Sequence, residues 1–168
     1  MKKLAYLSLG SNLGDRRANL EQALERLKDL GEVTATSSFY ETAPVDFTRQ
    51  PEFLNLAVAL ATEKMPKQLL HALLEIERSL GRKRTSAAAA VKGPRTLDID
   101  ILLFGSAIID TAELTIPHPR MHERRFVLEP LAEIAPDLRH PVFKRTMREL
   151  RDALPPSGGD WARKLTDD

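Results

Sequence analysis

Two aspartates separated by a single residue are the clearest chemical signal in this sequence. Asp98 and Asp100 lie in the run 97–104, which is otherwise apolar and predicts a central β-strand covered on both faces. Side chains alternate along a strand, so both carboxylates should point to the same face, with Cα atoms about 6–7 Å apart. Carboxylate oxygens suit magnesium, which takes one or two of them together with substrate phosphates. For this motif alone, a structural network with nearby arginines is the alternative.

The segment before this strand is strongly basic. Arginine forks bind phosphate oxygens in a bidentate way and can follow charge that develops in a transition state. ATP with magnesium would satisfy this segment and the two aspartates together, whereas a cationic surface patch is the alternative. Six cations and no acid lie between positions 78 and 97, namely Arg78, Arg82, Lys83, Arg84, Lys92 and Arg95.

Glu77 and His118 are further candidates. Glu77 continues the apolar stripe of a predicted helix, which places its carboxylate at the border of the core or of a cleft; a salt bridge to Arg82 or Arg84 is the alternative. His118 stands between two prolines, where a histidine is more often structural, so spacing alone does not make it a base. Four donors suited to phosphate or ribose follow it, namely Arg120, His122, Arg124 and Arg125.

The elements that must position these groups follow from hydrophobic periodicity. Period 2 in the strand 52–62 places Phe53, Asn55, Ala57 and Ala59 on one face. The order strand, helix, strand, strand, helix, strand is the βαββαβ arrangement of ferredoxin-like folds. We therefore expect an α+β fold with one mainly antiparallel sheet flanked by helices and a C-terminal extension. The predicted strands are 4–9, 33–41, 52–62, 97–104 and 107–109, and the predicted helices are 15–30, 66–80, 125–135 and 145–154.

Composition narrows the class of protein. A chain of 168 residues with 42% hydrophobic residues predicts a single domain, 1–168, with residues 155–168 as a loosely held tail. No cysteine is present, which rules out disulfides and thiolate metal sites. No apolar run approaches the roughly 20 residues of a membrane span, and we expect a cytoplasmic monomer without membrane contact. The net charge of +1 argues against a nucleic-acid partner, and no Walker-type phosphate loop occurs.

Several separate segments resemble one family, the 6-hydroxymethyl-7,8-dihydropterin pyrophosphokinases of folate biosynthesis. Together they span about residues 4 to 135 in the family's order. The sequence departs from the family pattern at Ala43, Leu74 and the alanine-rich loop 85–92, where Lys92 replaces a commonly aromatic residue. The segments that carry the resemblance are GSNLGD at 10–15, SSFYETAPV at 37–45, FLN at 53–55, GPRTLDIDI at 93–101, and IPHP at 116–119 with Arg124 and Phe126.

The resemblance implies an enzyme that transfers pyrophosphate from MgATP to the pterin hydroxymethyl group and releases AMP. It implies that Asp98 and Asp100 bind two magnesium ions and that Arg82 and Arg95 assist the transfer. The residues implied to hold ATP are Glu77, Arg84, Arg95, Ile101, Thr115, His118 and Arg124. Those implied to bind the pterin are Thr42, Ala43, Pro44, Val45, Phe53, Asn55 and Phe126.

Two other classes of protein were weighed against this one. A ferredoxin-like RNA-binding module should expose paired aromatics on a basic sheet, but aromatics are only 5% of this sequence and the net charge is near zero. A pterin aldolase or epimerase would account for the pocket, yet it leaves the aspartate pair and the arginines unexplained. Magnesium-dependent ATP binding would argue against an RNA-binding module. Loss of turnover on substitution of Asp98 or Asp100 would argue against a pterin aldolase or epimerase.

Overall fold

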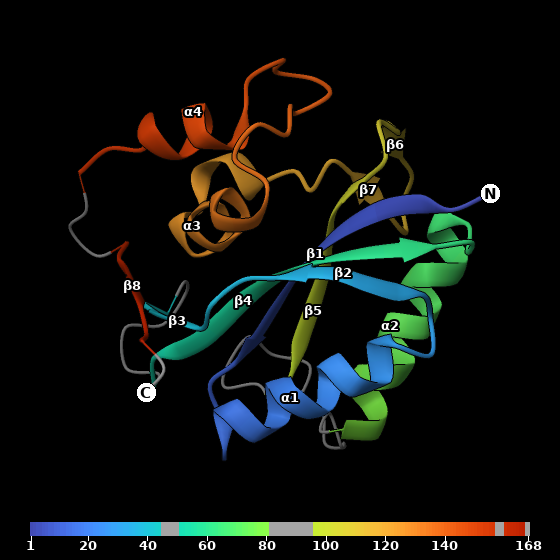
Figure 1. The fold of residues 1–168 in the computed structure, drawn as a ribbon, viewed down its shortest axis with the longest axis horizontal. Coiled ribbons are helices and arrows are strands. Elements are labelled where there is room, and N and C mark those ends of the chain that lie inside the picture. The colour runs from blue at the N-terminus through green and yellow to red at the C-terminus, as the bar shows by residue number, and fades with distance from the viewer. Residues whose placement is uncertain (45–50, 81–95, 157–159, 167–168) are drawn as a thin grey trace.

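The computed structural model describes residues 1–44, 51–80, 96–156 and 160–166. They form a six-stranded antiparallel sheet with helices on both faces, and a separate two-stranded sheet (Figure 1). The elements in chain order are β1 (Lys3–Ser11), α1 (Arg16–Leu27), β2 (Glu32–Thr36), β3 (Tyr40–Thr42), β4 (Phe53–Thr62), α2 (Pro66–Leu80), β5 (Asp98–Phe104), β6 (Ile109–Asp110), β7 (Thr115–Ile116), the 3-10 helix η2 (Met121–Glu123), α3 (Arg125–Ile134), α4 (Met147–Asp152) and β8 (Ala162–Lys164). The predicted βαββαβ core, running from β1 to β5, is confirmed.

The main sheet has the strand order β5-β1-β4-β3-β8, and β2 also pairs with β4. All of these pairs are antiparallel. The prediction that 97–104 is a central strand was wrong, because β5 pairs only with β1 among the described strands and stands at the end of the order. The prediction that both its faces are covered was right. Ile99 is buried in the core on one face of the sheet, and Leu102 is buried in the core on the other face. Because helices cover both faces of β5, its sequence is as apolar as that of a strand in the centre of a sheet.

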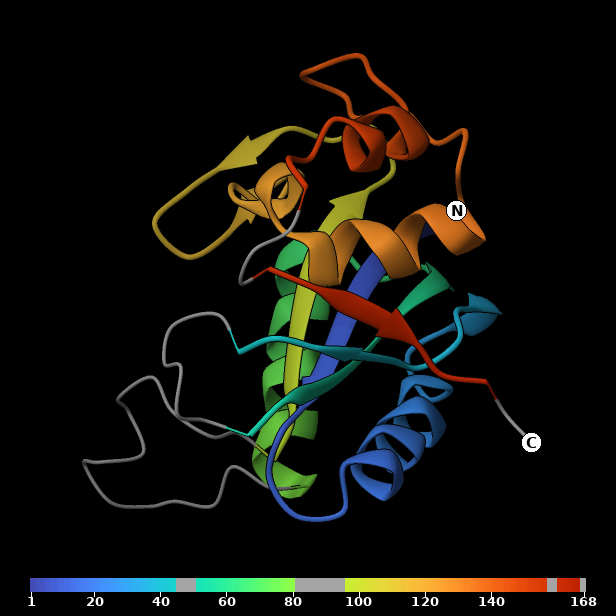
Figure 2. The same cartoon turned by 90° about the vertical axis from the view of Figure 1, so that its left-hand side faces the viewer.

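Each face of the sheet has its own core. Helices α1 and α2 cover one face, and α3 and α4 cover the other (Figure 2). Strand β4 shows the alternation that the sequence predicts: Leu54 and Leu56 are buried against α1 and α2, and Ala57 is buried against α3. A fully buried leucine contributes about 1.5–3 kcal/mol relative to an exposed one, so this alternation fixes the register of the strand.

The predicted strand 33–41 is two strands joined by a β-bulge. Thr36 pairs with Val58 and Tyr40 pairs with Asn55, so three residues, Ser37 to Phe39, lie opposite only two residues of β4. The extra residue is accommodated where the Ser37 hydroxyl accepts a hydrogen bond from Ala57 N at 2.9 Å. Because one added residue reverses the faces of the strand that follows, Tyr40 and Thr42 share the face of Asn55.

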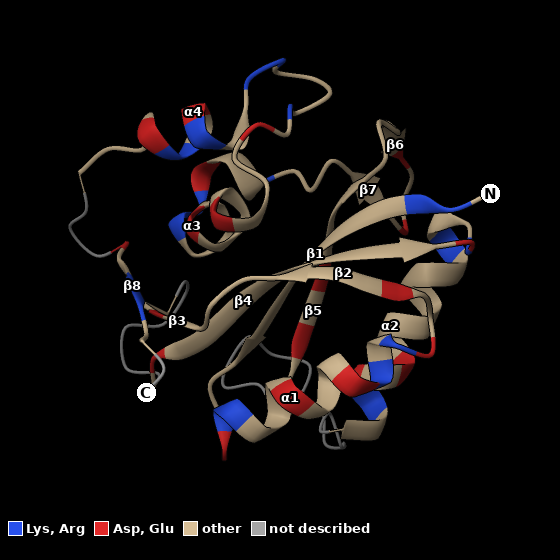
Figure 3. Cartoon of the chain, viewed as in Figure 1, with Lys and Arg blue, Asp and Glu red and all other residues tan. Residues whose placement is uncertain are grey.

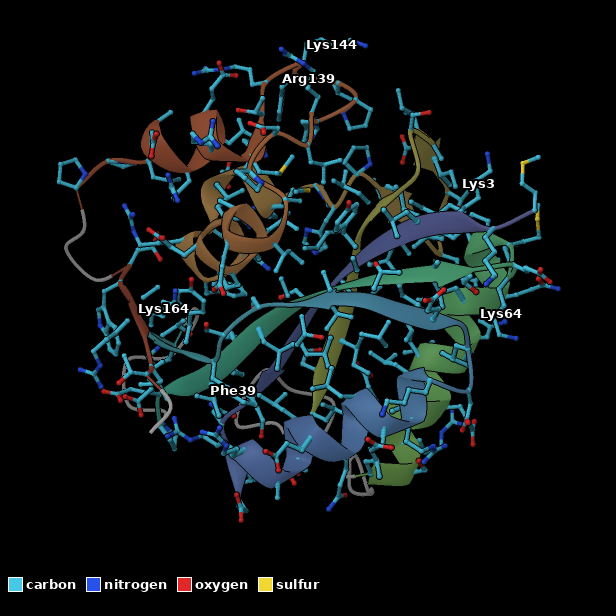
Figure 4. All side chains as sticks on the ribbon, in the orientation of Figure 1. Lys3, Phe39, Lys64, Arg139, Lys144 and Lys164 are labelled. Atoms are coloured by element: carbon cyan, nitrogen blue, oxygen red, sulfur yellow. The ribbon has the colours of Figure 1, made fainter. Side chains whose placement is uncertain are left out.

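Residues 160–166 are attached to the sheet, although the sequence predicts that 155–168 is a loosely held tail. Strand β8 pairs with β3, with Ala162 opposite Thr42. The edge of β3 that does not face β4 supplies the backbone hydrogen-bond partners that hold this segment. No local pattern in the sequence predicts such a pairing. Figure 4 shows Lys164 of β8 on the same side of the molecule as Phe39. Leu165 N, beside Lys164, donates to Phe39 O at 2.9 Å.

Local capping explains where two of the helices begin. Asp15 caps α1 by accepting a hydrogen bond from Ala18 N, and Thr146 and Glu149 form a capping box at the start of α4. No side chain caps α3, which begins directly after Arg124. Within the described ranges, no helix has the length and apolar character needed to cross a membrane.

Candidate active site

The two carboxylates of β5 lie on the face of the sheet that α3 covers. Asp98 and Asp100 are partly exposed, whereas Ile99 between them is buried in the core beneath α1 and α2. This is the common face that the alternation predicts. Figure 3 shows the acidic stretch of β5 within the otherwise uncharged centre of the sheet. The donor set of two carboxylates on one strand face fits magnesium, which takes one or two carboxylates and completes its shell with water and phosphate oxygens.

A buried carboxylate stands behind this pair. Glu77 on α2 is only 3% exposed, and its Oε2 accepts a hydrogen bond from Ile99 N at 2.6 Å. The sequence predicts that Glu77 lies at the border of the core or of a cleft. In the structure, its carboxylate contacts the backbone between the two aspartates. The alternative partners Arg82 and Arg84 lie outside the described residues.

Asn55 lies two strands away from Asp98 in the same cross-strand row. Gly10 of β1 pairs with Asp98 on one side and with Asn55 on the other. Asn55 is buried, and its Nδ2 donates to Thr42 Oγ1 at 2.7 Å. A Cβ on Gly10 would lie 2.5 Å from Asn55 Oδ1, so this position needs glycine for the close approach. The row brings a carboxylate and a buried amide together across a residue that has no side chain.

His118 is tied to the edge of β5. The backbone N–H of His118 donates a hydrogen bond to the carbonyl oxygen of Leu102 at 3.0 Å. At this point a bulge in the pairing of β1 with β5 leaves Leu102 without a partner on β1. The Nδ1 of His118 accepts a hydrogen bond from Arg120 N at 3.2 Å. Burial, and then the positive charge of Arg124, lowers the pKa of His118 to about 4, against the opposing effect of Asp98. At neutral pH the ring is therefore uncharged, and its Nε2–H is a donor.

Arg124 and Phe126 flank the start of α3. The guanidinium carbon of Arg124 lies 5.5 Å from the centroid of the Phe126 ring, close enough for a cation–π contact. Its Nε is buried without a hydrogen-bond partner in the described part of the chain. A buried donor of this kind carries a desolvation cost of about 1–3 kcal/mol, which an anionic acceptor would offset.

The structure brings together most of the described residues named from the sequence. Ile101 is the exception, because its side chain is buried in the core beneath α1 and α2, on the face opposite the aspartates. Thr115 lies in the short hairpin of β6 and β7. Phe53 approaches Gly10, and Ala43 and Pro44 follow β3 directly. Val45, Arg82, Arg84 and Arg95 lie outside the described residues.

Two contributors were missed by the residue-by-residue reading. Gly10 was noted only as part of a sequence signature, although its place between Asp98 and Asn55 requires that no side chain be present. Trp161 was assigned to a loose tail, yet its carbonyl accepts a hydrogen bond from Ala43 N at 3.1 Å. The predicted strand 4–9 stopped before Gly10, which lies inside β1, so its role could not be recognised; no local signal existed for Trp161.

The fold and the site define a class: a ferredoxin-like α+β protein with a carboxylate pair suited to metal-bound phosphates, in the same cross-strand row as the buried amide of Asn55. Residues 6–136 match the model of the family described as 7,8-dihydro-6-hydroxymethylpterin-pyrophosphokinase (HPPK). The chain belongs to this family. Its members are ATP-dependent pyrophosphokinases, so the chain is an enzyme of this type, a transferase of folate biosynthesis.

Individual relatives agree with the family. The chain is 50% identical over 136 residues to the 2-amino-4-hydroxy-6-hydroxymethyldihydropteridine pyrophosphokinase of Bacillus subtilis, covering 80% of this chain and 79% of the relative. The enzyme of the same name from Aquifex aeolicus is 37% identical over 146 residues, covering 87% and 89% of the two chains. The folic acid synthesis protein fol1 of Schizosaccharomyces pombe is 40% identical over 93% of this chain, which spans only 21% of that longer protein.

Solved structures share the fold. A Plasmodium falciparum HPPK-DHPS triple mutant superimposes with a TM-score of 0.73 at 22% sequence identity. The match covers 90% of this chain and 44% of the Plasmodium chain, so the chain corresponds to less than half of that protein. An HPPK-DHPS in complex with substrates gives a TM-score of 0.70 at 18% identity, covering 91% of this chain and 43% of that one. At these identities the likeness concerns the fold alone.

Proposed function

We propose that the chain transfers pyrophosphate from MgATP to the hydroxymethyl oxygen of 6-hydroxymethyl-7,8-dihydropterin and releases AMP, with the roles below for its residues. The observation that carries the proposal is the cross-strand row in which Asp98 and Asn55 flank Gly10. Phosphates held at the aspartate would lie beside a buried amide that can recognise the edge of a heterocycle.

Asp98 and Asp100 are proposed to hold two magnesium ions, which would bind with the triphosphate of ATP. No group of three or more His, Cys, Asp or Glu that could form a metal cage is found in the ranges that the structure describes. Two carboxylates, with substrate phosphates and water as the remaining ligands, form the arrangement typical of magnesium at nucleotide sites. When bound, the metal ions supply neutralisation of the phosphate charge. Glu77 keeps the backbone between the two carboxylates in place.

The ATP site is proposed to lie between β5 and the start of α3. His118 offers an uncharged Nε2–H donor, and the unpaired Nε of Arg124 offers a second donor to phosphate oxygens. Transfer asks mainly for positioning and charge neutralisation, so no strong general base is assigned. The resemblance adds Glu77, Arg84, Arg95, Ile101 and Thr115 as ATP contacts and Arg82 with Arg95 as residues that assist the transfer. Ile101 can contribute only through its backbone if its side chain stays in the core.

The pterin pocket is proposed to lie between β3, β4 and the first turn of α3. Asn55 gives one Nδ2 hydrogen to Thr42 and keeps a second N–H and its Oδ1 for the amide edge of the ring. Flat contacts are assigned to Phe53 and Phe126, the walls on either side of this amide. The remaining contacts are assigned to Thr42, Ala43, Pro44 and Val45.

The setting is proposed as well. We expect residues 1–168 to act as a single domain and as a monomer, without nucleic-acid or membrane partners. A chain without cysteine fits the reducing cytoplasm.

The test is AMP formation by purified protein with ATP, magnesium and 6-hydroxymethyl-7,8-dihydropterin, with and without EDTA. Asp98→Asn and Asp100→Asn should each lower the rate by about 100-fold or more, the scale at which loss of one electrostatic contact to a transition state acts. Asp137→Asn is the matched control, because Asp137 forms an exposed ion pair with Arg148 on α4. Release of ADP, or full activity in both site variants, would contradict the proposal.

A further inference from the structure

The segment Asp160–Leu165, here called the β8 segment, lies beyond the residues 6–136 that match the family model. It runs along the strand that carries Thr42. Trp161 O accepts a hydrogen bond from Ala43 N at 3.1 Å, and Leu165 N donates to Phe39 O at 2.9 Å. Thr42 therefore stands between two strands, with Phe53 of β4 opposite it on one side and Ala162 of β8 on the other. The position of this wall of the proposed pterin pocket depends on the β8 segment.

The same segment is held to the opposite wall by one side chain. Arg125 stands between Arg124 and Phe126 at the start of α3, and its guanidinium is mostly buried. Its Nε donates to Asp160 O at 3.1 Å and its Nη2 donates to Pro155 O at 2.6 Å. The remaining nitrogen, Nη1, lies 3.4 Å from a carboxylate oxygen of Glu129 on the same helix. Arg125 thus joins the turn that carries Phe126 to the segment that aligns Thr42.

Apolar packing does not replace this connection. An open groove of about 390 Å³ separates the β8 segment from α3 and α4. Half of its lining residues are charged, namely Arg125, Glu129, Arg151 and Asp152, and the other half are Leu154, Pro156, Trp161 and Ala162. On the far side, Arg163 packs over the Trp161 ring and pairs with Glu41, which Arg16 also holds at 2.9 Å. The segment is therefore firmly tied to β3, while its side-chain tie to α3 in the described residues is the hydrogen bond from Arg125 to Asp160 O, supported by the bond from the same guanidinium to Pro155 O before the segment.

We infer that Arg125 is a positioning residue for pterin binding. The C-terminal end of α3 is held to β3 directly, by the hydrogen bond from Tyr40 to Glu133 at 2.8 Å. Arg125 acts at the N-terminal end of α3, where through the β8 segment it sets the distance between Thr42 on β3 and Phe126. This inference rests on the proposed function. The phosphate-binding groups on β5 and in the His118 loop are held separately, by Glu77 and by the carbonyl of Leu102. Arg124, on the same turn as Arg125, is the one proposed phosphate donor that this change could disturb. Loss of Arg125 should consequently weaken pterin binding clearly more than ATP binding.

The experiment compares Arg125→Gln and Arg125→Lys with the wild type, and uses Arg148→Gln on α4 as the matched control. Arg148 forms an exposed ion pair with Asp137, and among the described residues it makes no hydrogen bond or ion pair with the β8 segment. Pterin affinity is measured by calorimetry in the presence of magnesium and a non-hydrolysable ATP analogue. KM for each substrate and kcat are measured in the AMP assay. Acrylamide quenching of Trp161, the sole tryptophan in the sequence, reports release of the segment.

Arg125→Gln should bind pterin about tenfold more weakly, which corresponds to about 1.4 kcal/mol, with KM for ATP within about twofold of the wild type. Trp161 should become more accessible to acrylamide, and Arg125→Lys should fall between because an ammonium cannot reach two carbonyls as a planar fork does. Unchanged pterin affinity in Arg125→Gln, or equal weakening of pterin and ATP binding, would overturn this inference but leave the proposed function standing. A wild-type protein that fails to bind pterin would overturn the proposed function and this inference together.

Discussion

The carboxylate of Glu77 accepts a hydrogen bond from the backbone N–H of Ile99 at 2.6 Å. Ile99 is the residue between Asp98 and Asp100, so a buried group on α2 holds the strand from behind at the point where both carboxylates emerge in front. Burial of this acceptor is acceptable because it is hydrogen-bonded. The geometry of the proposed metal site on β5 is therefore coupled to the packing of α2 on the opposite face of the sheet.

Glu77→Ala should lower the free energy of unfolding by about 1–3 kcal/mol, because it leaves the buried Ile99 N–H without its acceptor. It should also lower kcat in the AMP assay, since the strand between the aspartates loses its support. Glu77→Gln retains a side-chain oxygen and should recover most of the stability. Urea unfolding measures the first effect. The control is Glu75→Ala, which removes an exposed carboxylate of the same helix, and equal losses in both variants would contradict the coupling.

Gly10→Ala should impair pterin binding more than ATP binding. The added Cβ would lie 2.5 Å from Asn55 Oδ1, and Asn55 is buried and already bonded to Thr42, so the amide must move. We expect KM for pterin to rise about tenfold, equivalent to about 1.4 kcal/mol of binding energy. Steady-state kinetics with each substrate varied in turn measures the split.

A double-mutant cycle with Asn55→Ala separates this clash from a general loss of stability. Once the amide is gone, the methyl group of Ala at position 10 has no oxygen to displace, so the second substitution should add little to the effect of the first. Fully additive effects on KM for pterin would mean that Gly10 acts through the fold and not through Asn55.

His140 makes the stability of the loop before α4 depend on pH. Its Nδ1 accepts hydrogen bonds from Val142 N and Phe143 N, each at 3.2 Å, and its ring stacks on Phe143. Burial, and to a lesser degree the charge of His122, lowers the pKa of His140 from its ordinary value of 6.5. The unfolded chain therefore binds the proton more readily, and this contribution to stability is present above about pH 6.5 and is lost as the pH falls toward the lower folded-state pKa.

Urea unfolding at pH 7.5 and pH 5.5 tests the role of His140. The wild type should lose more stability on acidification than His140→Asn, whose side-chain oxygen can take the place of Nδ1 without titrating. His71→Asn serves as the control, because His71 is exposed and pairs with Glu113. A pH dependence in His140→Asn identical to that of the wild type would assign the effect to other groups.

Both tyrosines should resist ionisation in the folded protein. Burial raises the pKa of Tyr6, and burial together with the hydrogen bond to Glu133 raises the pKa of Tyr40. Absorbance titration should therefore show less tyrosinate near pH 10 in the folded protein than in the unfolded chain, and more should form when the protein unfolds. Since the unfolded phenols ionise near pH 10, the stability that they contribute is lost as the pH rises above that value. Tyr40→Phe should remove half of the delayed signal; a normal titration near pH 10 in the wild type would contradict the prediction.

The sequence was sufficient for the central fold because local signals and burial agree there. Strand β4 illustrates this: its period-2 pattern identifies Asn55 as the polar member of the face that holds Asp98 and Asp100. Helix α2 was similarly defined by Pro66 at its start and by its apolar stripe. In these two elements the spacing of apolar side chains along the sequence and the packing in the folded protein favour the same secondary structure.

Other features depend on contacts between distant segments. Strand β5 looked central because both its faces are buried, although only one of its edges is paired within the described sheet. The tail looked loose because its residues are polar, whereas Trp161 and Leu165 are held through backbone groups that any sequence possesses. The sequence offered Arg82 or Arg84 as partners of Glu77, but its hydrogen bond with the main-chain N–H of Ile99 could not be foreseen, because a backbone partner leaves no trace in the sequence.

The bulge at Ser37–Phe39 also bears on how relatives of this chain should be aligned. A relative that lacks one residue of this stretch can pair Thr36 and Tyr40 with the same β4 residues in a regular ladder, so a gap there leaves the pocket unchanged. A gap placed inside Tyr40–Thr42 would instead turn Thr42 away from Asn55. For this part of the chain, the position of a one-residue gap therefore carries more functional information than the identity of the residues around it.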